Sequence, residues 1–209
     1  VFGDEKLSHF DIANLGVSVY GYAFTSSAHR ENPLLRVDIK EDANIKRLCA
    51  HTGAGVPLSP YAPMSYADME GCGFRYAALG HIHKTPEHYV SKTLTAAYCG
   101  FGEGRAFDEI GKGSALSVSL FEIGEEIELK TEGLSFSDYS FELLPVDISG
   151  AQMSADIIED IEKAIREKGY GEKNAVRIIL SGSTDIGFEA NIDGILRNCA
   201  HLADLIEIK

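Results

Sequence analysis

The stretch "GFRYAALGHIHKTPEHY", residues 73–89, decides how this chain is interpreted. Its apolar run YAAL ends at Gly80 and is followed by His81 and His83, with one isoleucine between them. A short apolar run bounded by a glycine is typical of a buried strand. Residues at positions i and i+2 of a strand point the same way, so two imidazoles at its end are expected to face one site or two adjacent metals. Gly80 is predicted to allow a tight turn, and the segment 84–86 to end the strand.

A second strand-end histidine strengthens this interpretation. The stretch "NIKRLCAHTGAG", residues 44–55, is a short apolar strand that ends at His51 and a glycine-rich loop. A single H-x-H is often a pair of surface histidines, and a single His51 is often a loop cap. Two such strand ends about thirty residues apart favour one shared metal site built from His51, His81 and His83.

The composition limits which binding partners and which cellular compartment are expected for this chain. The 209 residues carry a net charge of −13, so the chain by itself is expected to repel nucleic-acid phosphates. No apolar run reaches the roughly 20 residues that a membrane span needs, and the first residues lack the apolar core expected of a secretory signal. The four cysteines form no C-x-x-C pair, so they are expected to be reduced thiols of a cytoplasmic protein, with one disulfide as the alternative.

The first part of the chain is predicted to be rich in strands. Strands are expected over residues 15–24, 45–49, 76–80 and 91–98, with a short helix over 65–73. Alternating apolar and polar residues on both sides of Gly124 predict a hairpin. A separate strand is expected over 139–149.

The last part of the chain alternates helices with strands. An amphipathic helix is predicted over 154–169, with Ser154 as its N-cap and Gly169 at its exit. A strand over 174–182, a helix over 188–200 and a strand over 202–209 follow. The predicted fold class is therefore α+β, with one domain over residues 1–134 and a small α+β domain over 135–209.

Other catalytic patterns are absent or weak in the sequence. "GFGEG" at residues 100–104 is not followed by the lysine of a phosphate-binding P-loop, and no G-x-S-x-G nucleophile motif occurs. Asp108 and Glu109 are expected to be solvated acids on a loop. The remaining histidines are interpreted as surface or core residues: His9, His29, His88 and His201.

The motifs resemble a known family. "YAALGHIHK", preceded by "AHTG" and "YAPMSYADME", resembles the C-terminal half of a calcineurin-like metallophosphoesterase. Within that superfamily the chain is most similar to the SbcD-type DNA double-strand-break repair exonucleases. The stretch "YCGFGEGRAFDEIGKGSALSV" resembles the segment that follows G-H-x-H there, and the tail from about residue 135 resembles the family's small capping domain.

The resemblance implies a fold, a cofactor and a set of ligands. The fold is the C-terminal half of a β-sandwich flanked by helices, followed by a small capping domain. The cofactor is a pair of divalent metal ions, usually manganese, that supports phosphodiester hydrolysis. His51 and His81 correspond to ligands of one metal, and His83 corresponds to a ligand of the other.

The chain departs from the family pattern in its catalytic motifs. The family also uses an upstream D-x-H, a bridging Asp and a G-N-H-D/E motif, and none of these occurs here. We therefore expect a fragment with no catalytic residue of its own, weak or no metal binding alone, and an exposed strand edge or apolar face that favours a homodimer.

Three functions are compatible with this pattern. The first is part of a DNA exonuclease whose partners are DNA and an ATPase subunit with a coiled coil. The second is a phosphoesterase of the same fold that acts on nucleotides or small phosphoesters, an alternative that the acidic charge favours mildly. The third is a non-catalytic remnant that binds a partner. No membrane partner is expected.

Overall fold

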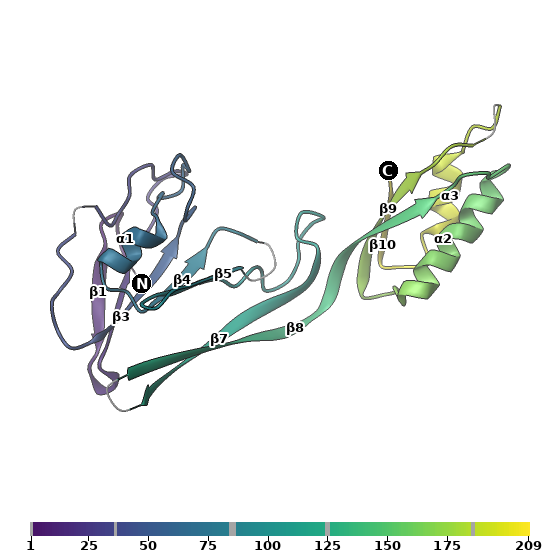
Figure 1. Cartoon of the computed structure of the whole chain (residues 1–209). Coiled ribbons are helices and arrows are strands. Elements are labelled where there is room, and N and C mark those ends of the chain that lie inside the picture. Colours follow the sequence, from purple (N-terminus) through teal and green to yellow (C-terminus); the bar gives the residue numbers. More distant parts are fainter. Residues whose placement is uncertain (1, 36, 84–86, 124–125, 185–186) are drawn as a thin grey trace. The chain divides into compact units, whose positions relative to one another are not determined.

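The computed structural model describes residues 2–35, 37–83, 87–123, 126–184 and 187–209 (Figure 1). The chain is an α+β protein, as predicted, with two mixed sheets and few helices. It divides into two compact units. The first comprises residues 1–100 and 116–134, and the second comprises residues 101–115 and 135–209. All four cysteines are free, and no helix of the described residues has the length and apolar character of a membrane span.

The first unit is built on a six-stranded sheet. Its strands lie in the order β1-β2-β3-β4-β6-β5. The bounds are β1 Ser8–Ile12, β2 Val17–Gly21, β3 Ile45–His51, β4 Tyr76–Gly80, β5 Glu87–Val90 and β6 Thr95–Tyr98. The neighbouring pairs from β2 to β6 are parallel, and the edge strands β1 and β5 are antiparallel to their neighbours. Parallel pairing brings the carboxyl ends of β3 and β4 to the same edge.

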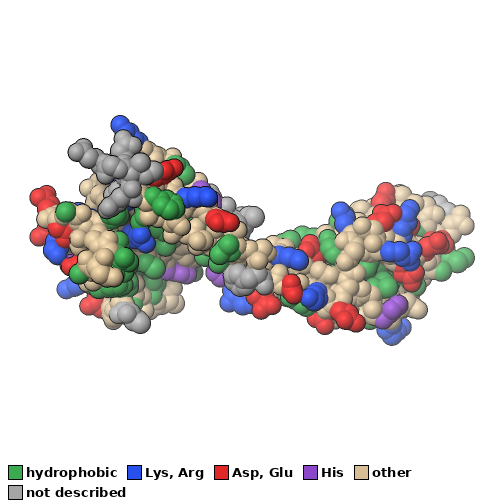
Figure 2. Space-filling model, turned by 90° about the horizontal axis from the view of Figure 1, so that it is seen from below, with side chains coloured by type: hydrophobic (Ala, Val, Ile, Leu, Met, Phe, Trp, Pro, Cys, Tyr) green, Lys and Arg blue, Asp and Glu red, His purple; other side chains and the backbone are tan. Residues whose placement is uncertain are grey.

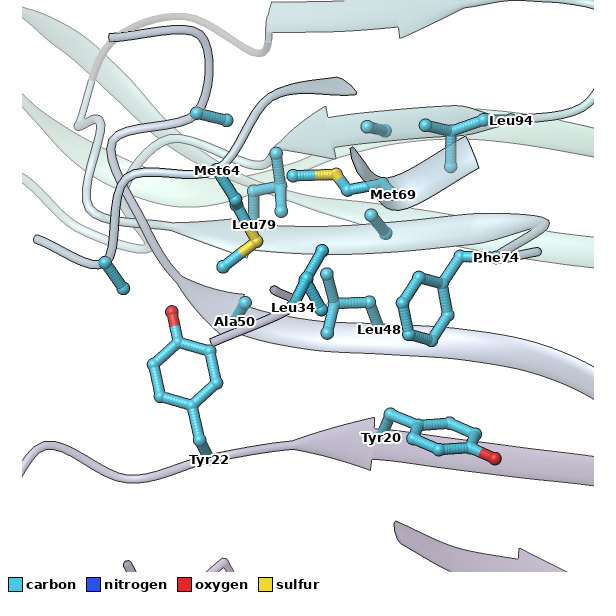
Figure 3. Packing of buried hydrophobic residues seen from close by; sticks show 14 of the residues in the cluster. Tyr20, Tyr22, Leu34, Leu48, Ala50, Met64, Met69, Phe74, Leu79 and Leu94 are labelled. Atoms are coloured by element: carbon cyan, nitrogen blue, oxygen red, sulfur yellow. The ribbon is translucent and has the colours of Figure 1, made fainter. Parts of the chain in front are cut away.

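The core of the first unit lies on one face of this sheet. Alternation along the strands places Tyr20, Leu48 and Leu79 on that face, where they pack with Met69 and Phe74 (Figure 3). Met69 comes from the helix α1, Tyr66–Gly71, which begins at the capping residue Ser65. This confirms the short helix predicted over residues 65–73.

The opposite face of the sheet is less covered. Cys49 lies on that face and is exposed, whereas Arg47 is half-buried. The Nε of Arg47 is buried with no hydrogen-bond partner among the described residues, and burial lowers the pKa of its guanidinium. A β-strand places successive side chains on opposite faces, so His51 shares this face with Cys49.

A four-stranded sheet has the order β10-β9-β8-β7, and its strands β9 and β10, residues 111–115 of β7 and residues 135–147 of β8 belong to the second unit. The bounds are β7 Gly111–Ile123, β8 Glu126–Asp147, β9 Asn174–Ser181 and β10 Leu205–Ile208. Strands β8, β9 and β10 are parallel. The helices α2, Ser154–Lys168, and α3, Ile192–Cys199, lie side by side against this sheet (Figure 1). Their buried residues, including Ile161 and Ile195, form a separate apolar core with Val176 and Ile178 of β9.

Three sequence predictions are corrected by the elements. The strand expected over 91–98 is shorter, because β6 covers only residues 95–98 and residues 91–94 connect it to the antiparallel strand β5. The separate strand expected over 139–149 is the continuation of β8. Serines near the expected start of that strand are accommodated within β8: the hydroxyl of Ser137 donates to the carbonyl of Tyr139, and the side chain of Asn174 donates to the hydroxyl of Ser140. The turn at Gly124 lies outside the described residues.

The start of α2 is the third correction. Its N-cap is Met153 rather than Ser154, and the side chain of Asp156 accepts hydrogen bonds from the backbone N–H groups of Gln152 and Met153. An acidic residue in the first turn can satisfy these groups without a Ser side chain. The predicted end of this helix at Gly169 is confirmed, since Gly169 adopts a left-handed conformation with a φ of 69°.

Candidate metal site

His51 and His81 lie at the ends of two neighbouring strands. His51 is the last residue of β3, and His81 directly follows the last residue of β4. The parallel register pairs His51 with Gly80, and the Thr52 N–H donates to the Gly80 carbonyl at 3.1 Å. In α/β enzymes, the active site is usually formed by residues at the carboxyl ends of adjacent parallel strands. The sheet therefore brings together two histidines that are thirty positions apart.

The two imidazoles are close and nearly perpendicular. Their ring centroids lie 5.1 Å apart with an interplanar angle of 63°. A Cβ on Gly80 would lie 3.5 Å from the Nδ1 of His51, which is ordinary contact, so the glycine leaves room beside this nitrogen. Two ring nitrogens at this separation can approach one cation without a change in the fold.

The tight turn after β4 falls on His81, not on Gly80. His81 has a φ of 106°, whereas the φ of Gly80 lies outside the left-handed range. A residue with a Cβ rarely adopts such a φ, and strain of this kind costs on the order of 1–3 kcal/mol. The surrounding contacts thus hold His81 in an unfavourable conformation next to His51. The predicted strand stop at residues 84–86 lies outside the described residues.

The electrostatics favour neutral imidazoles. Burial is the main cause that lowers the pKa of His51, and charges on His81 and His83 lower it further. Burial also lowers the pKa of His81, again with a contribution from His83. A neutral imidazole has a free lone pair, which is the form that binds a metal. The direction of both pKa shifts favours the neutral form that can bind a metal.

The described histidines supply only part of a metal site. His83 is exposed, and its charge acts on both His51 and His81. Within the described ranges, no cluster of three or more His, Cys, Asp or Glu side chains could hold a metal ion. Two neutral imidazoles fit part of the coordination shell of a divalent transition metal. Two neutral imidazoles leave the charge of a cation unbalanced, and the described residues add no carboxylate to this cluster.

Aromatic rings frame the histidine pair, and the sequence patterns did not single them out. The ring of Tyr61 lies 4.3 Å from that of His81 and 6.2 Å from that of His51. Phe24 meets His51 edge to face at 5.5 Å, and the Tyr22 hydroxyl donates to the His51 carbonyl at 2.6 Å. These contacts come from residues outside the named strands, with Tyr22 directly after β2, so no local motif could reveal them. They restrict how both imidazoles can rotate.

One residue that seemed unremarkable in the sequence is buried. Glu109, predicted to be a solvated acid, is 2% exposed. Its carboxylate accepts hydrogen bonds from the backbone N–H, the Nε and the Nη2 of Arg105. The arginine supplies three donors, which makes burial of the charge tolerable. Asp108 is exposed, as expected.

Comparison with known proteins gives one informative similarity. No family model matches the chain. The uncharacterized metallophosphoesterase YhaO of Bacillus subtilis (strain 168) is 29% identical over 186 residues, which are 86% of this chain and 43% of that protein. The chain thus spans less than half the length of this relative. The name of the relative states the enzyme class that the G-H-x-H stretch resembles, and it states neither a nuclease activity nor a metal. The histidine pair therefore lies in a chain that is similar to a metallophosphoesterase.

Proposed function

We propose that this chain is part of a metal-dependent phosphoesterase and that His51 and His81 bind one divalent metal ion. The observation that carries the proposal is their juxtaposition, with ring centroids 5.1 Å apart at the ends of adjacent parallel strands. The similarity to a metallophosphoesterase over 86% of the chain supports the same reaction class. The lowered pKa of each imidazole supports a role as ligand rather than as proton donor at neutral pH.

The residues of this chain have distinct roles in the proposal. His51 and His81 orient one ion, and His83 is assigned to a second ion. Tyr61 packs against His81 and limits its rotation, so it acts as a positioning residue. When bound, a pair of divalent ions supplies the electrophilic stabilisation of a phosphoryl group and a nucleophilic hydroxide. No side chain described here is assigned the general acid or base.

The proposal extends to how the site is completed. The described residues bring no carboxylate into a cluster with the histidines. We infer that the bridging carboxylate and the catalytic histidine come from polypeptide outside these 209 residues. The chain alone should accordingly bind Mn²⁺ weakly and hydrolyse no phosphodiester. An aspartate or asparagine–histidine motif encoded next to this sequence would supply the missing groups.

The substrate is proposed to be DNA, by analogy with the SbcD-type exonucleases. The resemblance of the G-H-x-H stretch and of residues 98–118 to that branch supports this choice. The net charge of −13 is an argument for the second candidate, a nucleotide or small phosphoester, because an acidic surface repels a polyanion. Acidic side chains are visible on both units in Figure 2. A DNA substrate therefore requires a basic partner surface, such as an ATPase subunit.

The experiment compares two substrates on the full-length gene product that contains these residues. Linear double-stranded DNA and nucleoside monophosphates are each incubated with Mn²⁺, and products are quantified. The proposal predicts hydrolysis that His81→Ala reduces by about 100-fold or more, because a metal ligand is lost. His88→Ala is the matched control, since His88 is exposed on β5.

Each outcome of this comparison has a definite meaning. DNA cleavage supports the nuclease, and cleavage of the monophosphates alone supports the second candidate. Unchanged hydrolysis by His81→Ala would exclude His81 as a ligand. No hydrolysis of either substrate by the full-length product would favour the third function, a non-catalytic partner-binding protein.

A further inference from the structure

A large open groove of the first unit is lined by neither His51 nor His81. It has a volume of about 1340 Å³, and its described lining comes from residues 4–7, Thr25, residues 29–33, Leu35, residues 37–38, 55–57 and 63–65, and Asp68. Small-molecule pockets have volumes of about 300–1,000 Å³ and enclose most of their ligand. This groove is larger and open to solvent, so its dimensions suit a polypeptide segment better than a metabolite.

One wall of the groove is apolar and exposed. Leu35 is 70% exposed and Val56 is 53% exposed, and both line the groove. Three prolines continue this lining, namely Pro33, Pro57 and Pro63. Exposed apolar side chains that line one groove together with prolines are a common feature of protein-binding surfaces. Covering Leu35 and Val56 would remove apolar area from water and so favour association.

The wall that carries Leu35 is held in place. The side chain of Asn32 donates to Asp68 at 2.9 Å and accepts from the Leu34 N–H at 2.9 Å. Leu34 itself is 6% exposed and belongs to the core. The loop is thereby fixed to both α1 and the core. A groove with a fixed wall is preformed, which lowers the ordering cost of binding.

The charged residues that line the groove indicate which kind of ligand it can bind. Its described lining contains more carboxylates than cations: Asp4, Glu5, Glu31, Asp38 and Asp68 against Lys6 and Arg30. Thr25 and His29 interact with Glu5, and Asn32 and Ser65 with Asp68. Glu31 and Asp38, in contrast, make no hydrogen bond or ion pair with any described residue. Two exposed carboxylates that no described residue pairs, beside exposed apolar side chains, complement a basic and apolar segment.

We propose that this groove docks a segment of a separate polypeptide that combines Lys or Arg with large apolar side chains. Leu35 and Val56 contact the apolar residues of that segment, and Glu31 and Asp38 pair with its cations. A nucleic acid is disfavoured because its phosphates would face these carboxylates. A second copy of this chain is disfavoured because each copy carries a net charge of −13.

The test selects short random peptides on phage against the purified 209-residue chain, and then measures a synthetic peptide of the enriched sequence by fluorescence anisotropy. The proposal predicts enrichment of peptides that contain both basic and apolar residues. Leu35→Asp should weaken binding about tenfold or more, since it removes an apolar contact. Leu58→Asp is the matched control, because Leu58 is 92% exposed and does not line the groove.

A second variant, in which two carboxylates of the groove are replaced by lysines, tests the proposal without relying on the Leu35 substitution. Glu31→Lys with Asp38→Lys should weaken the same peptide, and the loss should shrink as salt is raised. Glu41→Lys, an exposed residue outside the groove, should bind as the wild type does. The proposal is overturned if no peptide is enriched, if enriched peptides lack basic residues, or if the Leu35 and Leu58 variants bind alike. Binding of a fluorescent single-stranded DNA that Leu35→Asp abolishes would also overturn it.

Discussion

At the scale of single residues, His81 concentrates the unusual features of this protein. It follows β4 with a φ of 106°, lies 5.1 Å from the ring of His51 and packs 4.3 Å from Tyr61. Strained non-glycine residues tend to occur at functional sites, where surrounding contacts enforce the conformation. A conformation of this kind places the imidazole beside His51 instead of letting it turn towards solvent.

The charge of His83 gives a first prediction. Because His83 lowers the pKa of both other histidines, His83→Ala should raise the pKa of His51 and of His81. Protons would then compete with a metal at a higher pH than in the wild type. NMR titration of the imidazole carbons measures these values, with His88→Ala as control. A pKa of His81 that is unchanged or lower in His83→Ala would contradict the assignment.

The buried carboxylate of Glu109 gives a second prediction. Glu109→Ala removes the acceptor of three Arg105 donors, so the second unit should lose about 1–3 kcal/mol of unfolding free energy. Asp108→Ala, next to it and exposed, should change the unfolding free energy by less than about 0.5 kcal/mol. Urea unfolding followed by circular dichroism measures both. Equal effects of the two variants would show that the burial of Glu109 is unimportant for stability.

The two histidines of the site could be predicted from the sequence, but the aromatic residues that contact them could not. His51 and His81 each follow an apolar run, which is a local pattern. Tyr61 and Phe24 meet them only because the chain returns to the same edge of the sheet. Contacts of this kind depend on the tertiary path, which leaves no periodicity in the sequence. The positive φ of His81 could likewise not be predicted, because the neighbouring Gly80 adopts such a φ more easily and was the expected site of the turn.

At the scale of elements, the strands were predicted wherever apolar runs were long. The βαβαβ order of the second unit was recovered because its helices have clear apolar faces. β1 was not predicted, since four of its five residues are exposed and no apolar alternation distinguishes it. The length of β8 was underestimated because its buried serines look like a loop in the sequence.

Close backbone packing within the second unit gives a third prediction. A Cβ on Gly113 of β7 would lie 1.9 Å from the carbonyl oxygen of Gly102, so Gly113→Ala must displace backbone. We expect a loss of about 1–3 kcal/mol in unfolding free energy. Gly133→Ala is the control, because nothing lies within 4 Å of its Cβ position. If both variants unfold at the urea concentration of the wild type, then Gly102 does not lie against β7 in solution.

At the scale of the whole molecule, the two units have separate apolar cores. Ile161 is fully buried in the core of the second unit, which shares no residue with that of the first. Ile161→Ala should therefore lower the stability of the second unit by about 2–5 kcal/mol. Hydrogen exchange of β9 amides should accelerate, whereas β3 and β4 amides should exchange as in the wild type. Acceleration in all three strands would show that the units unfold together.

The central claim is that His51 and His81 bind the same metal ion in a site that these 209 residues leave incomplete. Paramagnetic broadening by Mn²⁺, recorded on the imidazole signals at substoichiometric metal, tests it most directly because it detects weak binding. The account predicts that His51 and His81 broaden first, that His88 and His201 stay sharp, and that His81→Ala removes the effect on His51. Equal broadening of all histidines, or calorimetric binding of two Mn²⁺ ions tightly per chain, would contradict it.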